Sequence, residues 1–256
     1  MARKTTKRIE VVILSPEKDI SFILKTSLPV KSSQIILNGE ILENGIKIAS
    51  PANWRLILSW AGTYKTYQTT FNLSGNPVTT YFTSGGILRI RISVSIKGKE
   101  HFTSTKVKII GQNPTREQLN QVFPNDLLKA IAWQESSWKQ FDAKGNPLKN
   151  PDSSMVGLMQ ISERWWGSPL SPIKSNNFNQ IAWDWSYNIQ AATEILDYYY
   201  KRVVNKYPHE TETSKWNRTL KAYHAGESTI KTKASANDFW YVKKIRNHIR
   251  EKPWEK

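Results

Sequence analysis

The stretch Asn125-Asp-Leu-Leu-Lys-Ala-Ile-Ala-Trp-Gln-Glu135-Ser136 decides how the second half of the chain is interpreted. Asn125 can cap a helix, because its side-chain oxygen can accept an otherwise unpaired amide of the first turn. Leu128, Ile131 and Glu135 follow at spacings of three and four, which places them on one helical face. A carboxyl in line with an apolar face is either buried, which raises its pKa, or lies at the helix edge, exposed or paired with a lysine. The buried alternative has the property that a general acid needs, a proton retained near neutral pH.

Five short motifs run through the same part of the chain. They are Glu135-Ser136, Gly157-Leu-Met159-Gln160, Asn188-Ile189, Ala222-Tyr223-His224-Ala-Gly226 and Tyr241-Val-Lys-Lys-Ile245. Their order and spacing resemble the soluble lytic transglycosylase family, in which Glu-Ser, Gly-Leu-Met-Gln, Asn-Ile, Ala-Tyr-Asn-Ala-Gly and Tyr-Val-x-Lys-Ile follow one another. The resemblance covers roughly residues 115 to 250. Five motifs in register favour the catalytic interpretation of Glu135.

The resemblance implies a lysozyme-like, all-helical domain that cuts peptidoglycan without water. In this family the C6 hydroxyl of N-acetylmuramic acid attacks its own C1, so the β-1,4 bond to N-acetylglucosamine breaks and a 1,6-anhydro end forms. The resemblance implies that Glu135 acts first as acid and then as base, and that Tyr223 reaches it or the attacking hydroxyl. It also implies substrate contacts for a further set: Ser136, Gly157, Met159, Gln160, Asn188 and Tyr241. For Asn188 a buried tie between helix and loop is the alternative, and for Tyr241 a place in the core.

Two positions depart from the family pattern. His224 stands where the family usually has Asn, and Ala192 stands where Gly follows the Asn-Ile pair. Neither removes the acid or the tyrosine, so the departures bear on the fit of the substrate and not on the class of reaction. We expect His224 to be a tolerated polar replacement.

Helical signals start after Gly111-Gln-Asn-Pro-Thr115. Thr115-Arg-Glu-Gln118 has the spacing of a capping box. Further helices are expected from Ser186 to about Asn205, from Ser214, and from Asn237 or Asp238. Nine of the 11 tryptophans lie in this part, and the adjacent Trp165 and Trp166 cannot both face a core. We expect one of them, Trp165, to line a glycan cleft.

Residues 8 to 111 show the alternation of strands instead. The expected strands are Ile9–Leu14, Ser33–Leu37, Trp54–Trp60, Ile87–Ile96 and Phe102–Ile110. Turn signals separate them at Asn38-Gly39, Glu43-Asn-Gly45, Ser74-Gly-Asn-Pro77 and Gly85-Gly86. Short strands at such intervals predict an Ig-like antiparallel β-sandwich. The predicted organisation is therefore α+β in two domains, a sandwich over residues 1–112 and the transglycosylase domain over 113–256, with the sandwich serving as a spacer or as a docking or targeting module.

The formal net charge of +16 calls for an anionic partner. Nucleic acid and a polyanionic cell envelope both fit the charge, but no nucleic-acid-binding module is recognisable. The chain has no cysteine, and no apolar run is long enough to span a bilayer. The loop around Asp142 and Asp152 lacks the ligand spacing of a calcium site. We expect neither a metal nor a cofactor.

Three other functions compete with that of a lytic transglycosylase. A hydrolytic muramidase on the same fold would need a base for water, and Asp142, Asp152 and Asp184 are the candidates. A glycan-binding module with a dead site is opposed by the presence of Glu135 and Tyr223. A nucleic-acid binder has only the charge in its favour.

The N-terminal segment lacks the features of a signal peptide. Ile9–Leu14 is too short for the apolar region of one, and Glu10 interrupts it. We therefore expect synthesis in the cytoplasm and action in the periplasm or cell wall after delivery by a holin, a phage tail or a type VI secretion system. The N-terminal domain would contact a secretion or phage-tail component, and a cognate inhibitor protein would protect the producer.

Overall fold

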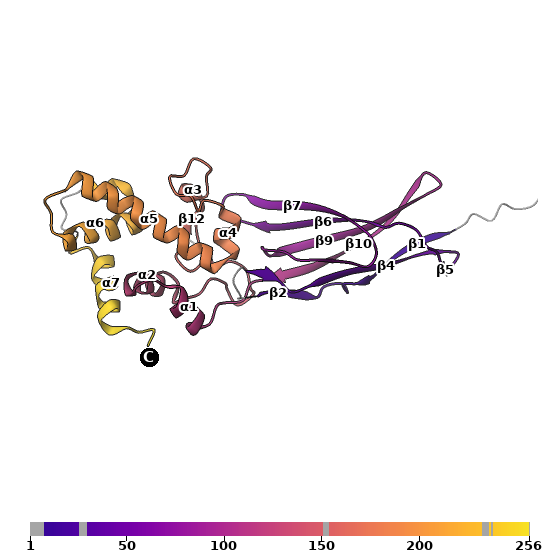
Figure 1. The fold of residues 1–256 in the computed structure, drawn as a ribbon, viewed down its shortest axis with the longest axis horizontal. Helices are drawn as coiled ribbons and strands as arrows, with labels where there is room; N and C mark the ends of the chain where they lie inside the picture. Colours follow the sequence, from indigo (N-terminus) through magenta and orange to yellow (C-terminus); the bar gives the residue numbers. More distant parts are fainter. Residues whose placement is uncertain (1–7, 26–29, 151–153, 232–235, 237, 256) are drawn as a thin grey trace, which may run out of the picture. The chain divides into compact units, whose positions relative to one another are not determined.

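The computed structural model describes residues 8–25, 30–150, 154–231, 236 and 238–255. The chain divides into two compact units, Met1–Gln112 and Asn113–Lys256 (Figure 1). The first is built of strands and the second of helices with one small hairpin. Among the helices of the described part, none has the length and apolar character that crossing a membrane requires.

The N-terminal unit contains two main sheets. The larger has six strands in the order β3-β2-β10-β9-β6-β7. Its strands are β2 (Ser21–Lys25), β3 (Lys31–Ser32), β6 (Asn53–Ala61), β7 (Thr66–Ser74), β9 (Gly86–Ile96) and β10 (Lys99–Ile110). The smaller joins β1 (Ile9–Ser15), β4 (Ile35–Glu43) and β5 (Ile46–Lys47), with β8 (Val78–Thr80) pairing with β4.

Strand β9 shows the alternation that the sequence predicts. Leu88, Ile90 and Ile92 are each 0% exposed, whereas Arg89 between them is exposed. Period-two burial turns every second side chain of this strand into the core and the others to the outer face of the sheet. The larger sheet therefore has one apolar face and one polar face.

The expected Ig-like antiparallel sandwich is not confirmed. Strand β2 pairs with β10 in parallel through Ser21–Ile23, and in the described part of this unit five strands, β2 among them, were not expected from the sequence. Strand β7 escaped prediction because its side chains are mostly polar and exposed, so it lacks an apolar period. Strands of two or three residues carry no period at all.

The predicted turn at Asn38-Gly39 is wrong, because both residues lie inside β4. Gly39 is there for close packing: a Cβ on it would lie 2.6 Å from Cδ1 of Ile92 and 2.8 Å from the carbonyl oxygen of Val12. The side chain of Asn76 completes the contact by exchanging hydrogen bonds with the Gly39 backbone at 2.9 and 2.7 Å. An Asn-Gly pair can therefore mark a point of close approach as well as a turn.

The C-terminal unit is helical, as expected. Its helices are α1 (Arg116–Val122), α2 (Asp126–Ser136), α3 (Glu163–Trp166), α4 (Phe178–Trp183), α5 (Trp185–Lys206), α6 (Glu212–Ala225), the 3-10 helix η1 (Glu227–Lys231) and α7 (Trp240–Glu251). The short hairpin joins β11 (Met155–Val156) to β12 (Ile161–Ser162). The loop of the hairpin carries the Gly-Leu-Met-Gln motif.

Two predicted helix starts are confirmed. Thr115 and Gln118 form the reciprocal capping box of α1. The side chain of Asn125 accepts the amide of Leu128 at 3.0 Å and caps α2. These caps depend on neighbours three residues away, which is why local sequence predicts them.

Three other helices begin elsewhere than predicted. Asp184, not Ser186, caps α5, because its carboxylate accepts the amides of Ser186 and Tyr187 and its charge favours the helix N-terminus. Thr211, not Ser214, caps α6. Helix α7 begins at Trp240 after Phe239, without a side-chain cap. Asp238 precedes that start, and Asn237 lies outside the described residues.

Candidate active site

Glu135 lies in the last turn of α2 and is half-buried. The phenol of Tyr241, on α7, donates a hydrogen bond of 2.6 Å to its Oε1. Burial raises the pKa of Glu135 to about 7, while the hydrogen bond from Tyr241 opposes the rise by favouring the charged form. The carboxyl can therefore hold a proton near neutral pH and release it without leaving that range, as an acid that also serves as a base must do.

Tyr223, on α6, bonds here to neither of the two groups that the resemblance implies, and its contact with the attacking hydroxyl remains a prediction. Its phenol donates to the carbonyl oxygen of Met159 at 2.8 Å, and the hydrogen bond to Glu135 is made by Tyr241 instead. Burial raises the pKa of Tyr223 above its usual range, and the charge of Glu135 adds to that effect. Tyr223 therefore keeps its proton and donates it in a hydrogen bond, and the charge of Glu135 acts on its phenol.

The peptide groups of Met159 are held from two helices. Its N–H donates to Oδ1 of Asn188, on α5, at 2.8 Å, and its carbonyl accepts from Tyr223. The Met159 side chain is 0% exposed, so the expected contact of this side chain with the glycan would require it to move. In this structure it is the backbone of Met159 that bonds to Asn188 and Tyr223 and joins the hairpin loop to the two helices.

Asn188 matches the structural alternative foreseen for it. It is 0% exposed, and its amide nitrogen lies 3.0 Å from the carbonyl oxygen of Ile181 and 3.4 Å from that of Val156. With the bond to Met159, its side chain ties α5 to the hairpin loop. The structural role is thus visible in this structure, while the substrate contact that the resemblance implies for Asn188 remains a prediction.

Gln140 joins Asn188 beneath the hairpin loop, and sequence reasoning missed it. It is 0% exposed; its Oε1 accepts the amide of Leu158 at 2.8 Å and its Nε2 donates to Ala182 at 2.8 Å. Gly157 lies against both amides, since a Cβ there would be 2.6 Å from Nε2 of Gln140 and 2.7 Å from Nδ2 of Asn188. Gly157 is therefore required by internal packing, and the approach of a sugar expected there remains a prediction.

Ser136 and Gln160 also bond within the protein. The Ser136 hydroxyl lies 2.7 Å from the carbonyl oxygen of Leu158 and 3.1 Å from that of Ala132, and so joins the end of α2 to the loop. Gln160 is 7% exposed, has φ of 47°, and donates to the carbonyl of Gly157 at 2.8 Å. The two residues shape the loop beside Glu135 in this structure, while the substrate contacts expected of them remain predictions.

Trp165 and Trp166 separate as the sequence predicts. Trp165 is 66% exposed, whereas Trp166 packs edge-on against Tyr198 and Tyr199 with ring centroids 5.9 and 5.7 Å apart. An exposed indole on α3 offers the flat apolar surface that a sugar ring can cover. Its role in binding glycan remains a prediction.

The departure at His224 falls beside Tyr241, the hydrogen-bond partner of Glu135. The imidazole stacks on the ring of Tyr241, with centroids 4.4 Å apart and planes 18° apart, and meets Trp240 edge-on at 4.9 Å. Burial lowers the pKa of His224, which favours the neutral ring. Ala192, the other departure, is 0% exposed inside α5.

Two of the three carboxylates considered as bases for water accept backbone amides. Asp142 accepts the amides of Lys144 and Asn146 at 2.8 and 2.9 Å and closes a turn. Asp184 caps α5. Asp152 lies outside the described residues. Within the described ranges, no group of three or more His, Cys, Asp or Glu side chains could hold a metal ion.

Comparison with known proteins agrees with this geometry. A protein-family model described as the transglycosylase SLT domain matches residues 113–245, which include Glu135, the hairpin loop and the tyrosines of α6 and α7. No curated protein and no solved structure matches the chain.

Proposed function

Because the chain belongs to the transglycosylase SLT family, we propose that it is a lytic transglycosylase that cleaves peptidoglycan with Glu135 as its single acid and base. The observation that carries the proposal is the half-buried Glu135 carboxyl, whose pKa is raised to about 7 and which accepts a hydrogen bond from Tyr241. A second carboxylate is not needed for the reaction.

In the first step, Glu135 gives its proton to the glycosidic oxygen as the bond from that oxygen to C1 of N-acetylmuramic acid breaks. The carboxylate that results is stabilised by the phenol of Tyr241, which already donates to Oε1. In the second step, the C6 hydroxyl oxygen bonds to C1 and its proton passes to Glu135. The acid is thereby restored, and the product carries a 1,6-anhydro end.

The turn-closing role of Asp142 and the helix-capping role of Asp184 support a lyase over a hydrolase that would use either of them. An inverting hydrolase requires a second carboxylate about 6.5–9.5 Å from the acid to activate water, and a retaining one requires a nucleophile about 5–5.5 Å away. In each of these aspartates, Oδ1 accepts two backbone amides. A base that must keep these bonds would be weakened as an acceptor for water.

The test is mass spectrometry of the fragments that the protein releases from purified peptidoglycan. We expect 1,6-anhydro ends from the wild type and their loss in Glu135→Gln, which preserves the shape of the side chain and removes the proton donor. Fragments with reducing ends, one water heavier, would instead identify a hydrolytic muramidase. A folded wild type that releases no fragments would favour the glycan-binding alternative.

Delivery by a secretion system or a phage particle is part of the same proposal and stays a prediction of the sequence. In that case the N-terminal unit would dock onto the delivery apparatus. Fractionation of producing and target cells with an antibody against the chain would test it, since the protein should reach the target periplasm only when the apparatus is intact.

A further inference from the structure

The outer face of the larger sheet carries four basic side chains on neighbouring strands. They are Arg55 of β6, Arg89 and Arg91 of β9, and Lys106 of β10, here named the cationic face. Arg55 is the register partner of Arg91, and Arg89 is the partner of Lys106. The four positions therefore form a compact block on one side of the sheet.

This block places like charges directly opposite one another. Cβ atoms of such cross-strand pairs are about 4.5–5.5 Å apart, and like charges there destabilise a sheet. Arg89 and Arg91 are two residues apart on one strand, so they add a spacing of roughly 6.6 Å along it. Two cross-strand pairs of like charge each lower the stability of the sheet. Folding alone does not account for them, so they indicate a surface that binds a ligand.

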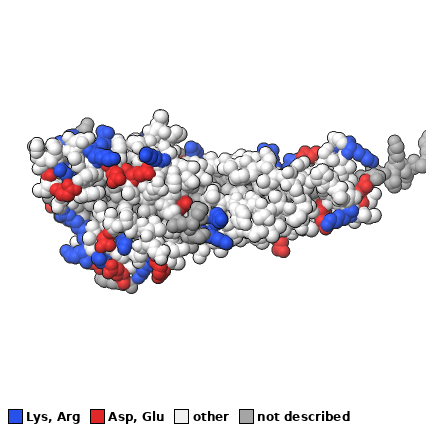
Figure 2. All heavy atoms as spheres, in the orientation of Figure 1, with Lys and Arg blue, Asp and Glu red and all other residues white. Residues whose placement is uncertain are grey.

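Among the described residues, an ion pair neutralises one of the four basic side chains of the block. Glu100 pairs with Arg91 at 2.9 Å. Within the residues that the structure describes, no ion pair reaches Arg55, Arg89 or Lys106. By contrast, acidic and basic side chains are interspersed over the visible surface of the helical unit (Figure 2).

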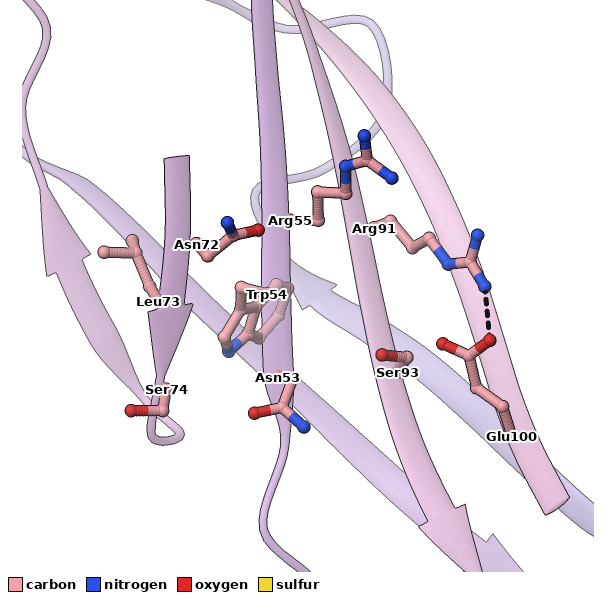
Figure 3. Close-up of a pocket in the computed structure, with 9 residues that line it drawn as sticks. All are labelled: Asn53, Trp54, Arg55, Asn72, Leu73, Ser74, Arg91, Ser93 and Glu100. Carbon is pink, nitrogen blue, oxygen red and sulfur yellow. Dashed lines mark hydrogen bonds and ion pairs between the residues drawn. The ribbon is translucent and has the colours of Figure 1, made fainter. Parts of the chain in front are cut away.

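The block is hollowed and lined with hydrogen-bonding groups. Two hollows of about 580 and 480 Å³ share Arg55 and Arg91. In the first, the guanidinium groups of Arg55 and Arg91 extend beside each other above the sheet, with Asn53 and Asn72 in the same lining (Figure 3). A chain of anionic groups bearing polar substituents would find both charge and hydrogen bonds here.

The lining lacks a platform for nucleobases. Proteins that hold single-stranded nucleic acid stack its bases on aromatic rings. Of the described residues that line the two hollows, Trp54 alone is aromatic, and it is 1% exposed. The nearby Phe102 is covered on one face by the guanidinium of Arg91, which lies 3.7 Å from the ring centroid. Charge complementarity without stacking favours a polyanion that has no bases.

We propose that the cationic face binds the free carboxylates of the peptides of peptidoglycan, and so holds the enzyme on the polymer that its helical unit cuts. The guanidinium forks of Arg55 and Arg89, which no ion pair in the described part of the chain reaches, match a carboxylate in geometry as well as in charge. The inference rests on the proposed function, because that function supplies the polymer.

Binding of the full-length chain to purified, intact peptidoglycan by co-sedimentation tests the proposal. Every protein carries Glu135→Gln, so that the polymer stays whole during the measurement. One variant adds Arg55→Gln, Arg89→Gln and Lys106→Gln; the matched control adds Lys25→Gln, Lys97→Gln and Lys99→Gln, which remove the same charge from exposed positions of the same unit. Thermal melting confirms that both are folded.

We expect the dissociation constant to rise about tenfold in the cationic-face variant, since each exposed charge pair contributes a factor of a few. The control should stay within about twofold of its parent, and the difference between the two should shrink as salt screens the charges. Equal weakening in both variants would overturn the proposal, because net charge alone would then explain binding. No weakening in either would overturn it too.

Chemical blocking identifies the bound group. Amidation of the peptidoglycan carboxylates with a neutral amine should lower binding of the parent to the level of the cationic-face variant. The carboxylate assignment is overturned if blocked material still binds and hydrofluoric acid, which cleaves phosphodiesters, abolishes that binding. It is also overturned if single-stranded DNA competes better than polyglutamate of equal charge.

Failure of the proposed function would be seen separately. Wild-type enzyme is assayed beside these measurements for release of 1,6-anhydro ends. If it releases none, the catalytic proposal fails, and the comparison of the two triple variants on intact peptidoglycan still decides whether the cationic face binds it.

Discussion

The phenol of Tyr241 donates a 2.6 Å hydrogen bond to Oε1 of Glu135, although 106 residues separate the two along the chain. Burial favours the protonated carboxyl, and this hydrogen bond favours the charged one. The pKa of about 7 is the balance of the two effects. Such a balance suits a group that must both give and take a proton in one turnover.

The first prediction concerns pH and rate. Because the acid must be protonated, kcat/KM on peptidoglycan should fall as pH rises through about 7, the pKa of Glu135. Tyr241→Phe removes the hydrogen bond that lowers this pKa, so its falling limb should move to higher pH. Initial rates of the wild type and of Tyr241→Phe, measured from about pH 5 to about pH 9, give the falling limb of each protein. Coincident limbs in the two proteins would contradict the role of the hydrogen bond.

The second prediction concerns stability. A folded-state pKa raised above the unfolded value means that wild-type stability falls as pH rises between the two, from 4.5 to about 7, and stays lower above that range. Glu135→Gln cannot ionise, so it should be more stable than wild type above pH 7, by on the order of 3 kcal/mol. The two proteins should converge near pH 4. Urea unfolding at several pH values checks this, and a constant difference would disprove it.

The third prediction compares two glycines with positive φ. Gly157→Ala combines backbone strain with a clash against the Gln140 and Asn188 amides, and should lower the free energy of unfolding by more than about 3 kcal/mol and displace the loop beside Glu135. At Gly226 a Cβ meets nothing within 4 Å, so Gly226→Ala should cost only the strain, about 1–3 kcal/mol. Denaturant melts give both values. Equal losses would show that packing at Gly157 is unimportant.

The fourth prediction concerns His224. His224→Ala removes the ring stacked on Tyr241 and should lower kcat, because Tyr241 loses the neighbour that holds its phenol toward Glu135. His224→Phe keeps an aromatic ring, worth about 0.5–1.5 kcal/mol in such a pair, and should retain most of the activity. Steady-state kinetics separates kcat from KM. An active His224→Ala with an inactive His224→Phe would assign the imidazole a polar role.

The fifth prediction separates the adjacent tryptophans. Trp165→Ala should leave the melting temperature unchanged and raise KM for glycan, since the indole is 66% exposed. Trp166→Ala should lower the free energy of unfolding by about 1–3 kcal/mol, because it packs on Tyr198 and Tyr199. Thermal melts and kinetics on soluble glycan fragments distinguish them. If Trp165→Ala is destabilised and binds normally, its indole has no part in the glycan cleft.

Local rules predicted those parts of the fold that depend on near neighbours. The caps at Thr115 and Asn125 and the alternating burial of β9 follow from residues within a few positions. The parallel pairing of β2 with β10 joins segments more than 80 residues apart and has no local signal. The polar strand β7 lacks a period, and a short pattern cannot show that Gly39 lies where strands meet.

The candidate site likewise has parts that local sequence predicts and parts that depend on residues far along the chain. Glu135 was predicted from its place in a helical stripe, and the motifs from their resemblance to a family. Which tyrosine bonds to Glu135 depends on how α6 and α7 pack, and the sequence order of the motifs does not contain that. Gln140, a lone polar residue after a helix, gave no signal, because its importance comes from Leu158, Ile181 and Ala182, which lie far along the chain.

The Met159 peptide, held by Asn188 at its N–H and by Tyr223 at its C=O, sets a condition on how the active site can rearrange. If Tyr223 left for a substrate hydroxyl, a buried carbonyl would be stranded at a cost of about 1–3 kcal/mol. The phenol can therefore change its acceptor without this cost only when an incoming N–H or O–H donates to the Met159 carbonyl at the same time. When substrate binds at Tyr223, a donor on the substrate must replace the phenol at the Met159 carbonyl. A ligand that donates from one atom and accepts at another can make this exchange, and a ligand that only accepts cannot.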